Sequence, residues 1–264
     1  MKQFTAIAIV TSSIFLIPAI SFSIYRFVRN CSVEKMLNEK YRIDTIIQTG
    51  LVKEALPTIY LAELLDLSSN KPKNFFTFDK KKATTQLLSS PLIKDARVEK
   101  KKPSIVYVDY NIRTPIAMIA DFTNTAIDIE GYSFGVAPFF SPKKLPEIFL
   151  GLKELPKKIE GAKIDLALSL YKLWEELVLL ESRLKKIDVS KAFHESYGKR
   201  EIVLKVENSH EHHFLRLSTK NYREELRNYL SIKDKMGDVK KERGNKVIDM
   251  RIAKIAYIEN VAND

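Results

Sequence analysis

Residues 75–115 constrain the fold most, because they read as a helix followed by two strands. Asp79 is placed to accept the free N–H groups at the start of a helix. Pro91 ends that helix, because a proline biases the residue before it away from the helical conformation. Apolar residues in the return strand then alternate with period two, at Val106, Val108 and Tyr110. We therefore predict a helix, a strand, a turn over 100–104 and a second strand.

An earlier strand and helix complete this unit. Residues 42–47 predict a strand that ends at Gly50, and 52–67 predict a helix with Pro57 near its start. The predicted module is therefore strand–helix–helix–strand–strand over residues 41–115.

Ten residues of this segment follow one another at characteristic spacing: Pro91, Ala96, Val98, Lys100, Pro103, Val106, Val108, Arg113, Pro115 and Ala117. The pattern resembles that of the POTRA module in the bacterial cell-division family FtsQ, called DivIB in Gram-positive bacteria. The resemblance implies a module that contacts other proteins of the division machinery (the divisome). Its exposed second strand, Arg97 to Lys102, is one candidate binding surface.

Residues 116–264 also resemble this family, whose second domain is rich in β-structure. The residues that carry the resemblance are Asp128, Gly131 and Phe134, then Leu145, Pro146 and Gly151, and finally Asp249, Met250 and Arg251. The patterns predict strands at 116–120, 126–129, 189–196, 200–206, 214–217 and 247–258. They predict helices at 164–187 and 221–230, and a charged loop at 233–246.

The N-terminal stretch from Phe4 to Tyr25 contains no charged residue and is long enough to span a bilayer. We expect residues 1–29 to hold a short N-terminus and a transmembrane helix, and residues 30–40 to form a polar connector. A cleaved signal peptide is the alternative, but no Ala-x-Ala site follows. The fold class expected for the whole chain is α+β: this helix, the POTRA module, and a mainly antiparallel β domain with flanking helices.

Charge and family resemblance disagree about the orientation of this helix. Arg26, Arg29, Lys35 and Lys40 follow it and only Lys2 precedes it, so the positive-inside rule places the bulk of the chain in the cytoplasm. The resemblance implies the reverse: a single-pass protein of the cytoplasmic (inner) membrane with its bulk outside the cytoplasm, at the division septum. We follow the resemblance, because long domains translocate largely regardless of charge.

The chain is basic, with 44 Lys and Arg against 33 Asp and Glu and a net charge of +11. Such a surface could meet nucleic acid, anionic lipid or envelope polymer. The basic residues form small scattered groups rather than an aromatic-studded stripe, which disfavours nucleic acid. The single cysteine, Cys31, excludes an internal disulfide.

We find no set of catalytic residues. His210, His212 and His213 form a short cluster with Glu211, but a zinc site needs three or four ligands with supporting partners. The cluster lies in a predicted hairpin, where a solvated turn is the simpler reading. The motifs of phosphate-binding loops, zinc proteases and serine hydrolases do not occur. We therefore expect a protein that is not an enzyme and has no cofactor or metal.

Binding remains, and a strand at a sheet edge can accept a partner strand through its unpaired main chain. The resemblance implies small bitopic coiled-coil partners of the FtsB and FtsL type, bound near the C-terminal end of the β domain. The candidate partner-binding residues are Ile248, Met250, Arg251, Ile252, Tyr222 and Arg223. In the alternative reading, Ile248, Met250 and Ile252 are the core-facing half of the last strand.

The sequence thus predicts a bitopic membrane scaffold that links early and late division proteins at the septum by binding alone. One alternative is a POTRA-containing envelope protein of secretion or outer-membrane assembly. Another is a metal protein or wall enzyme of the cell envelope, which only the histidine cluster and the basic charge favour.

Overall fold

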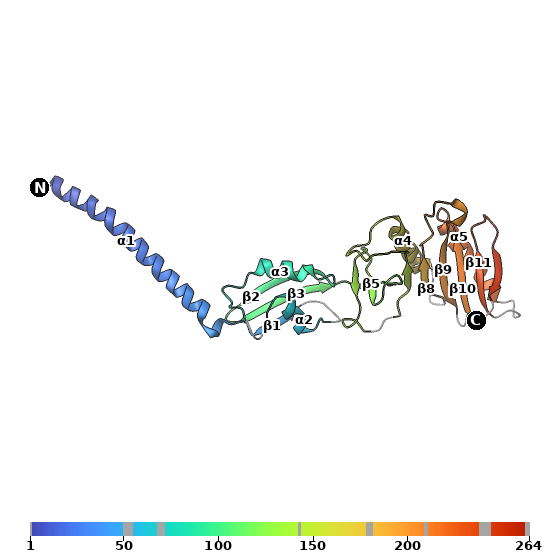
Figure 1. The fold of residues 1–264 in the computed structure, drawn as a ribbon, viewed down its shortest axis with the longest axis horizontal. Coiled ribbons are helices and arrows are strands. Elements are labelled where there is room, and N and C mark those ends of the chain that lie inside the picture. The colour runs from blue at the N-terminus through green and yellow to red at the C-terminus, as the bar shows by residue number, and fades with distance from the viewer. Residues whose placement is uncertain are drawn as a thin grey trace. The chain divides into compact units, whose positions relative to one another are not determined.

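The computed structural model describes residues 2–49, 55–67, 72–141, 144–177, 182–208, 211–237 and 244–261, without the side chains of 2–19 and 234–237. The chain divides into two compact units, Met1–Ile112 and Arg113–Asp264 (Figure 1). The division falls between Ile112 and Arg113, a few residues before the boundary expected from the sequence at 115. Each unit has its own sheet.

The first unit begins with a long helix, α1 (Lys2–Leu37). Most of the predicted membrane span lies among residues whose side chains are outside the described part. Within the part of the chain that is described, no helix is both long and apolar enough to cross a bilayer. The helix continues through most of the predicted connector, since residues 30–37 contain neither glycine nor proline. A 3₁₀ turn, η1 (Glu39–Tyr41), follows it.

The strand–helix–helix–strand–strand order predicted for this unit is present. Its elements are β1 (Thr45–Thr49), α2 (Thr58–Leu64), α3 (Lys80–Ser89), β2 (Ile93–Lys101) and β3 (Ile105–Ile112). The sheet order is β1-β3-β2, with β1 parallel and β2 antiparallel to β3. The helix α3 lies along this sheet (Figure 1).

The two helices of this unit differ in how well the sequence defined them. Asp79 caps α3 as predicted, because its Oδ1 accepts the N–H of Lys81 at 2.8 Å. In contrast, α2 is much shorter than the predicted helix 52–67. It starts after Pro57 and ends before Asp66, whose φ of 55° is left-handed. Residues 52–54 of that prediction lie outside the described chain.

The second unit contains one nine-stranded sheet, in the order β12-β11-β10-β9-β8-β7-β4-β5-β6. Its strands are β4 (Ala117–Ile119), β5 (Thr125–Ile127), β6 (Ser133–Gly135), β7 (Glu147–Phe149), β8 (Ser182–Asp188), β9 (Ile202–Asn208), β10 (Glu211–Leu217), β11 (Asn245–Asp249) and β12 (Tyr257–Val261). Five pairings are antiparallel and three are parallel, so the sheet is mixed with an antiparallel majority.

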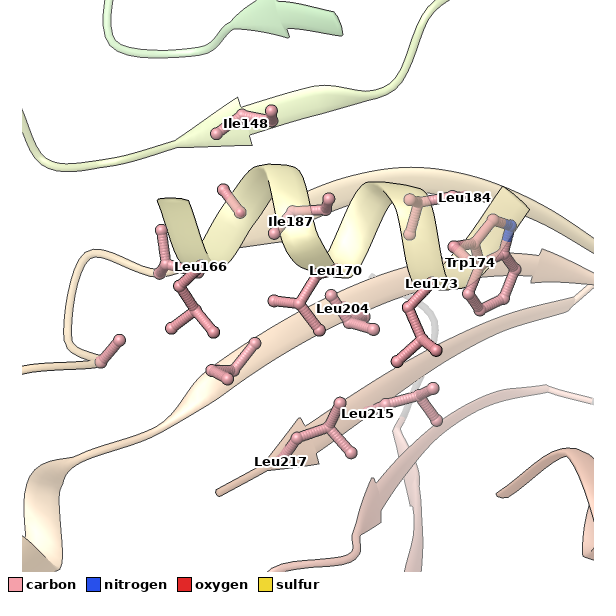
Figure 2. Packing of buried hydrophobic residues seen from close by; sticks show 14 of the residues in the cluster. Ile148, Leu166, Leu170, Leu173, Trp174, Leu184, Ile187, Leu204, Leu215 and Leu217 are labelled. Atoms are coloured by element: carbon pink, nitrogen blue, oxygen red, sulfur yellow. The ribbon is translucent and has the colours of Figure 1, made fainter. Parts of the chain in front are cut away.

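Two helices, α4 (Ala162–Leu177) and α5 (Tyr222–Gly237), pack on one face of this sheet. Residues in β9 and β10 alternate between buried and half-buried, as a sheet covered on one face requires. Figure 2 shows the α4 side chains that meet the strands: Leu166, Leu170, Leu173 and Trp174, opposite Leu204, Leu215 and Leu217. The opposite face is half-buried at β9 and β10, whereas β5 is buried on both of its faces.

The predicted helix 164–187 was wrong in its last part. The helix ends at Leu177, and β8 occupies 182–188. Leu184 continues the helical spacing but faces the core from β8, where it meets the same apolar layer. The predicted strand 189–196 was also wrong. Its chain turns there, because the Asp188 carboxylate accepts both the N–H and the hydroxyl of Ser190.

The predicted last strand, 247–258, was wrong in the same way. It is two antiparallel strands, β11 and β12, joined by a connection over 250–256. Lys254 has a φ of 65°, a left-handed conformation that no regular strand contains. The predicted charged loop 233–246 is helical up to Gly237, where α5 ends. Met250, Arg251 and Ile252 therefore lie outside any strand.

The Asp128–Gly131–Phe134 motif forms the turn before β6. Asp128 Oδ1 accepts the N–H groups of Glu130 and Tyr132, both at 2.9 Å. Gly131 has a φ of 90°, and a Cβ there would lie 2.8 Å from the carbonyl oxygen of Ile159. Glycine is thus required both by conformation and by space.

Candidate protein-interaction site

The strand β12 lies at one end of the nine-stranded sheet and pairs only with β11 among the described strands. All five of its residues are exposed. No described strand pairs with its outer side, so this edge can accept an added strand. This geometry is that of β-augmentation, in which main-chain bonds give affinity and side chains give specificity.

Exposed apolar side chains accompany this edge. Tyr257 is 62% exposed, and Ile252 and Ile255 in the preceding connection are 60% and 58% exposed. We call these residues, with Ile258 and Val261, the C-terminal edge; along β12, Tyr257 and Val261 lie on one face and Ile258 on the other. Exposed apolar residues gathered in one place indicate an interaction surface, whereas single ones do not.

The opposite end of the sheet is protected. There β6 has three residues, and Ser133 and Phe134 are buried. The Ser133 N–H donates to the carbonyl of Lys157 at 3.1 Å, and its hydroxyl donates to the carbonyl of Pro156 at 2.5 Å. A covered, short edge strand cannot accept a partner, so β12 is the open edge of this sheet.

Four charged side chains secure the chain where β11 ends. Arg251 holds Asp249 at 2.6 Å, and Arg216 holds Glu201 at 2.6 Å. Arg216 also lies 3.4 Å from Asp249. Burial would raise the pKa of Asp249, but its hydrogen bonds and ion pair with Arg251 outweigh burial, so the pKa lies below its usual value. This cluster fixes the start of the connection that leads to β12.

The pKa of Glu201 is lowered in the same way. Burial acts to raise it, and the hydrogen bond and charge of Arg216 outweigh that effect. Conversely, the Asp249 hydrogen bonds raise the pKa of Arg251. Arg251, a predicted partner-binding residue, is therefore already engaged within the fold and is only 24% exposed.

The other predicted partner-binding residues divide into buried and exposed ones. Ile248 is fully buried and Met250 is 6% exposed, which agrees with the alternative reading of these two as core residues. Ile252 is exposed. Tyr222 packs against the core at the start of α5, and the exposed Arg223 lies 5.7 Å from its ring. Their role in binding stays a prediction.

Sequence reasoning did not select the residues of β12 itself. Tyr257 and Ile258 fell at the end of one long predicted strand, which hid the fact that a second strand forms the edge. The signal that was available is the change in composition after Arg251, where three alanine and lysine positions interrupt the β-branched residues.

The histidine cluster does not come together as a ligand set. His210 lies outside the described residues. His213 is buried, with Nδ1 2.9 Å from the Tyr229 hydroxyl, whereas His212 belongs to the opposite face of β10. Burial and the nearby Lys246 lower the pKa of His213. Across the described residues, no three His, Cys, Asp or Glu side chains are grouped to hold a metal.

The second predicted surface, Arg97 to Lys102, lies on β2, an end strand of the three-stranded sheet. Lys100 faces inward: its Nζ donates to the carbonyls of Phe75 at 2.7 Å and Phe78 at 2.8 Å. Burial lowers its pKa. Arg97 is exposed and pairs with Glu99. The solvent-facing surface of β2 therefore presents Arg97, whereas Lys100 points toward the interior of the unit.

Comparison with known proteins identifies part of the chain. Residues 53–109 match the family of the POTRA domain, FtsQ-type. The match covers α2, α3, β2 and most of β3, and it supports the resemblance to the FtsQ/DivIB family found in the sequence. No curated protein matches the chain.

Proposed function

We propose, from the premise that this chain carries an FtsQ-type POTRA domain, that it is a scaffold protein of the bacterial divisome. It links early and late division proteins at the septum through protein–protein binding, and small bitopic coiled-coil proteins of the FtsB and FtsL type are its partners. POTRA domains mediate protein–protein interactions, and this type is associated with division and is not catalytic.

The open edge of the β domain is the observation that favours binding there. It combines a strand that no other described strand pairs with on its outer side with the apolar side chains of the C-terminal edge, and the other end of the sheet is covered. The partner adds a strand to β12 and covers Tyr257, Ile252 and Ile255. We assign Arg251 and the buried Ile248 and Met250 to shaping this surface from within.

The proposal includes a membrane anchor formed by residues 4–25, with the bulk of the chain outside the cytoplasmic membrane. It is supported by the length and lack of charge of that stretch and by the family resemblance. An anchor of this kind would leave both folded units on the same side of the membrane.

The competing function is that of an envelope POTRA protein of secretion or outer-membrane assembly. The observation that keeps it open is that only the POTRA segment, 53–109, matches a known family. A metal protein or wall enzyme of the envelope has less support, because the described histidines are not arranged as ligands.

A functional fluorescent fusion in growing cells tests the proposal. We expect it to concentrate at the division plane. The double variant Ile252→Ala/Tyr257→Ala should then weaken co-purification of small bitopic proteins by roughly ten-fold or more, since truncating an apolar or aromatic anchor at the centre of an interface costs about 1 kcal/mol or more.

The matched control is Leu155→Ala/Phe193→Ala, which truncates two side chains of the same unit that are 43% and 48% exposed and belong neither to β12 nor to the connection before it. Co-purification should be unchanged in the control. Uniform envelope labelling by a functional fusion would reject the divisome and favour the general envelope protein. Equal loss in both variants would reject β12 as the binding edge.

A further inference from the structure

The face of the nine-stranded sheet opposite α4 and α5 contains a basic cavity of about 630 Å³. It lies over β7, β8 and β9 and reaches His212 on β10, so β11 separates it from β12 in the sheet order. Five cationic side chains and two carboxylates line it: Lys144, Arg183, Lys185, Lys186, Lys205, Glu147 and Glu207. The cavity is therefore strongly electropositive and distinct from the C-terminal edge.

Two lysines in this cavity occupy directly opposite positions on neighbouring strands. Lys186 on β8 and Lys205 on β9 are paired in the antiparallel register. Like charges at directly opposite positions of a sheet destabilise it. No carboxylate among the described residues pairs with either one, whereas the neighbouring Lys185 is bound to Glu207 at 2.8 Å. On their other sides, Lys186 is in register with Glu147 of β7 and Lys205 is in register with Phe214 of β10.

Aromatic rings fix the positions of both ammonium groups. The Nζ atom of Lys186 lies 5.0 Å from the ring centroid of Phe149, and that of Lys205 lies 5.5 Å from the ring centroid of Phe214. Such contacts are favourable and restrain a side chain that would otherwise be mobile. The ammonium group of Lys186 is thereby directed toward β7 and that of Lys205 toward β10, so the two positive charges are spread across the sheet where carboxylates of an extended segment can meet them.

We propose that this cavity binds an extended acidic segment of a partner protein. Carboxylates at alternate positions of an extended segment project toward one face and would meet the lysines. The inference does not rest on the divisome assignment, because it follows from the charge and shape of the β domain alone.

Other anionic partners fit less well. Phosphate recognition favours arginine forks, helix N-termini or free backbone N–H groups, but the cavity's one arginine, Arg183, already donates to the carbonyl of Lys144. A membrane surface is flat and would leave the hollow unfilled. A second copy of this chain carries a net charge of +11 and would be repelled.

Binding of a fluorescent peptide to the full-length protein in detergent tests this proposal. The probe is an alternating Glu-Gly peptide of about ten residues, which spans roughly 30 Å when extended. We expect Lys186→Gln/Lys205→Gln to raise its Kd about ten-fold, which corresponds to about three-fold for each partly exposed charge contact. The matched control, Lys199→Gln/Lys220→Gln, removes the same net charge at two exposed positions outside the cavity.

The control should stay within about two-fold of the unmodified protein, since it leaves the paired lysines in place. Circular dichroism and Trp174 fluorescence would confirm that both variants are folded. Equal weakening by both variants, or no binding of the peptide, would overturn the proposal. So would an affinity for inorganic triphosphate or phosphatidylglycerol vesicles that depends on Lys186 and Lys205 while the peptide does not bind.

Discussion

Replacing Arg113 with methionine tests how the second unit is stabilised. The guanidinium Nη1 lies 2.6 Å from Asp128 Oδ2, and the two side chains are 9% and 6% exposed. The Arg113 guanidinium carbon also lies 3.6 Å from the ring centroid of Tyr132. Because methionine keeps most of the apolar stem, the substitution chiefly removes the charge and leaves Asp128 without its buried partner.

Breaking a buried ion pair from one side typically costs about 3–5 kcal/mol. We expect the lower end, about 3 kcal/mol, because Asp128 Oδ1 still accepts two backbone N–H groups. That is a large part of the roughly 5–15 kcal/mol that stabilises an ordinary domain. With a urea m-value of about 2–3 kcal/mol/M, the unfolding midpoint should fall by about 1–1.5 M.

Fluorescence of Trp174 during urea unfolding is the appropriate assay. It is the single tryptophan of the chain and lies in the core of the second unit at 3% exposed, so it reports on that unit alone. The control, Arg227→Met, makes the same replacement at an exposed position of α5 and should shift the midpoint little.

The double variant Arg113→Met/Asp128→Asn provides the refutation. The double variant should be at least about 1 kcal/mol more stable than the sum of the two single losses predicts, because it also removes the carboxylate charge that Arg113→Met leaves unpaired. A loss below about 1 kcal/mol for Arg113→Met, or an additive double variant, would show that the buried pair does not stabilise the unit as argued.

Two further predictions concern the same unit. Gly131→Ala should lower the free energy of unfolding by about 2 kcal/mol or more, because alanine would have a left-handed backbone there and its Cβ would lie 2.8 Å from the Ile159 carbonyl oxygen. The control, Gly198→Ala, has open space around it and should change stability little. Equal urea midpoints for the two variants, measured by Trp174 fluorescence, would contradict this prediction. The lowered pKa of Asp249 gives stability that is present above its unfolded value, about 3.9, and lost as pH falls through the lower folded value. Asp249→Asn should therefore lower the free energy of unfolding by about 1 kcal/mol at neutral pH, and the stability of the variant should fall less steeply as the pH is lowered. An unchanged dependence of stability on acidic pH would argue against the pairing with Arg251.

The sequence was most informative where local chemistry and long-range packing demand the same structure. The helix after Asp79 and the two strands that follow it were predicted closely, because a capping carboxylate and alternating apolar residues specify them locally. Gly131 was likewise recognised as a turn residue, since its positive φ is a local requirement. In these segments the pattern alone sufficed.

The predictions failed where one apolar pattern fits two structures. Leu177 and Leu184 continue a helical stripe, yet the chain leaves the helix between them and both residues still reach the core. The apolar positions after Val247 likewise read as one strand, although a left-handed Lys254 divides them. The spacing of apolar residues indicates which residues are buried, but for short apolar runs it does not show whether a helix or a strand buries them. Consequently β12, the edge proposed for binding, could be identified only from the sheet order.

The open edge of β12 bears on how much of this protein a cell makes relative to the proteins that it binds. Main-chain pairing is indifferent to sequence, so an unoccupied β12 offers the same hydrogen bonds to a wrong strand as to the right one. Only a few side chains, such as Tyr257, then distinguish the correct partner strand from a wrong one. We expect a cell that makes this protein in excess of its partners to accumulate misassociated copies, so that its supply and that of its partners must be matched.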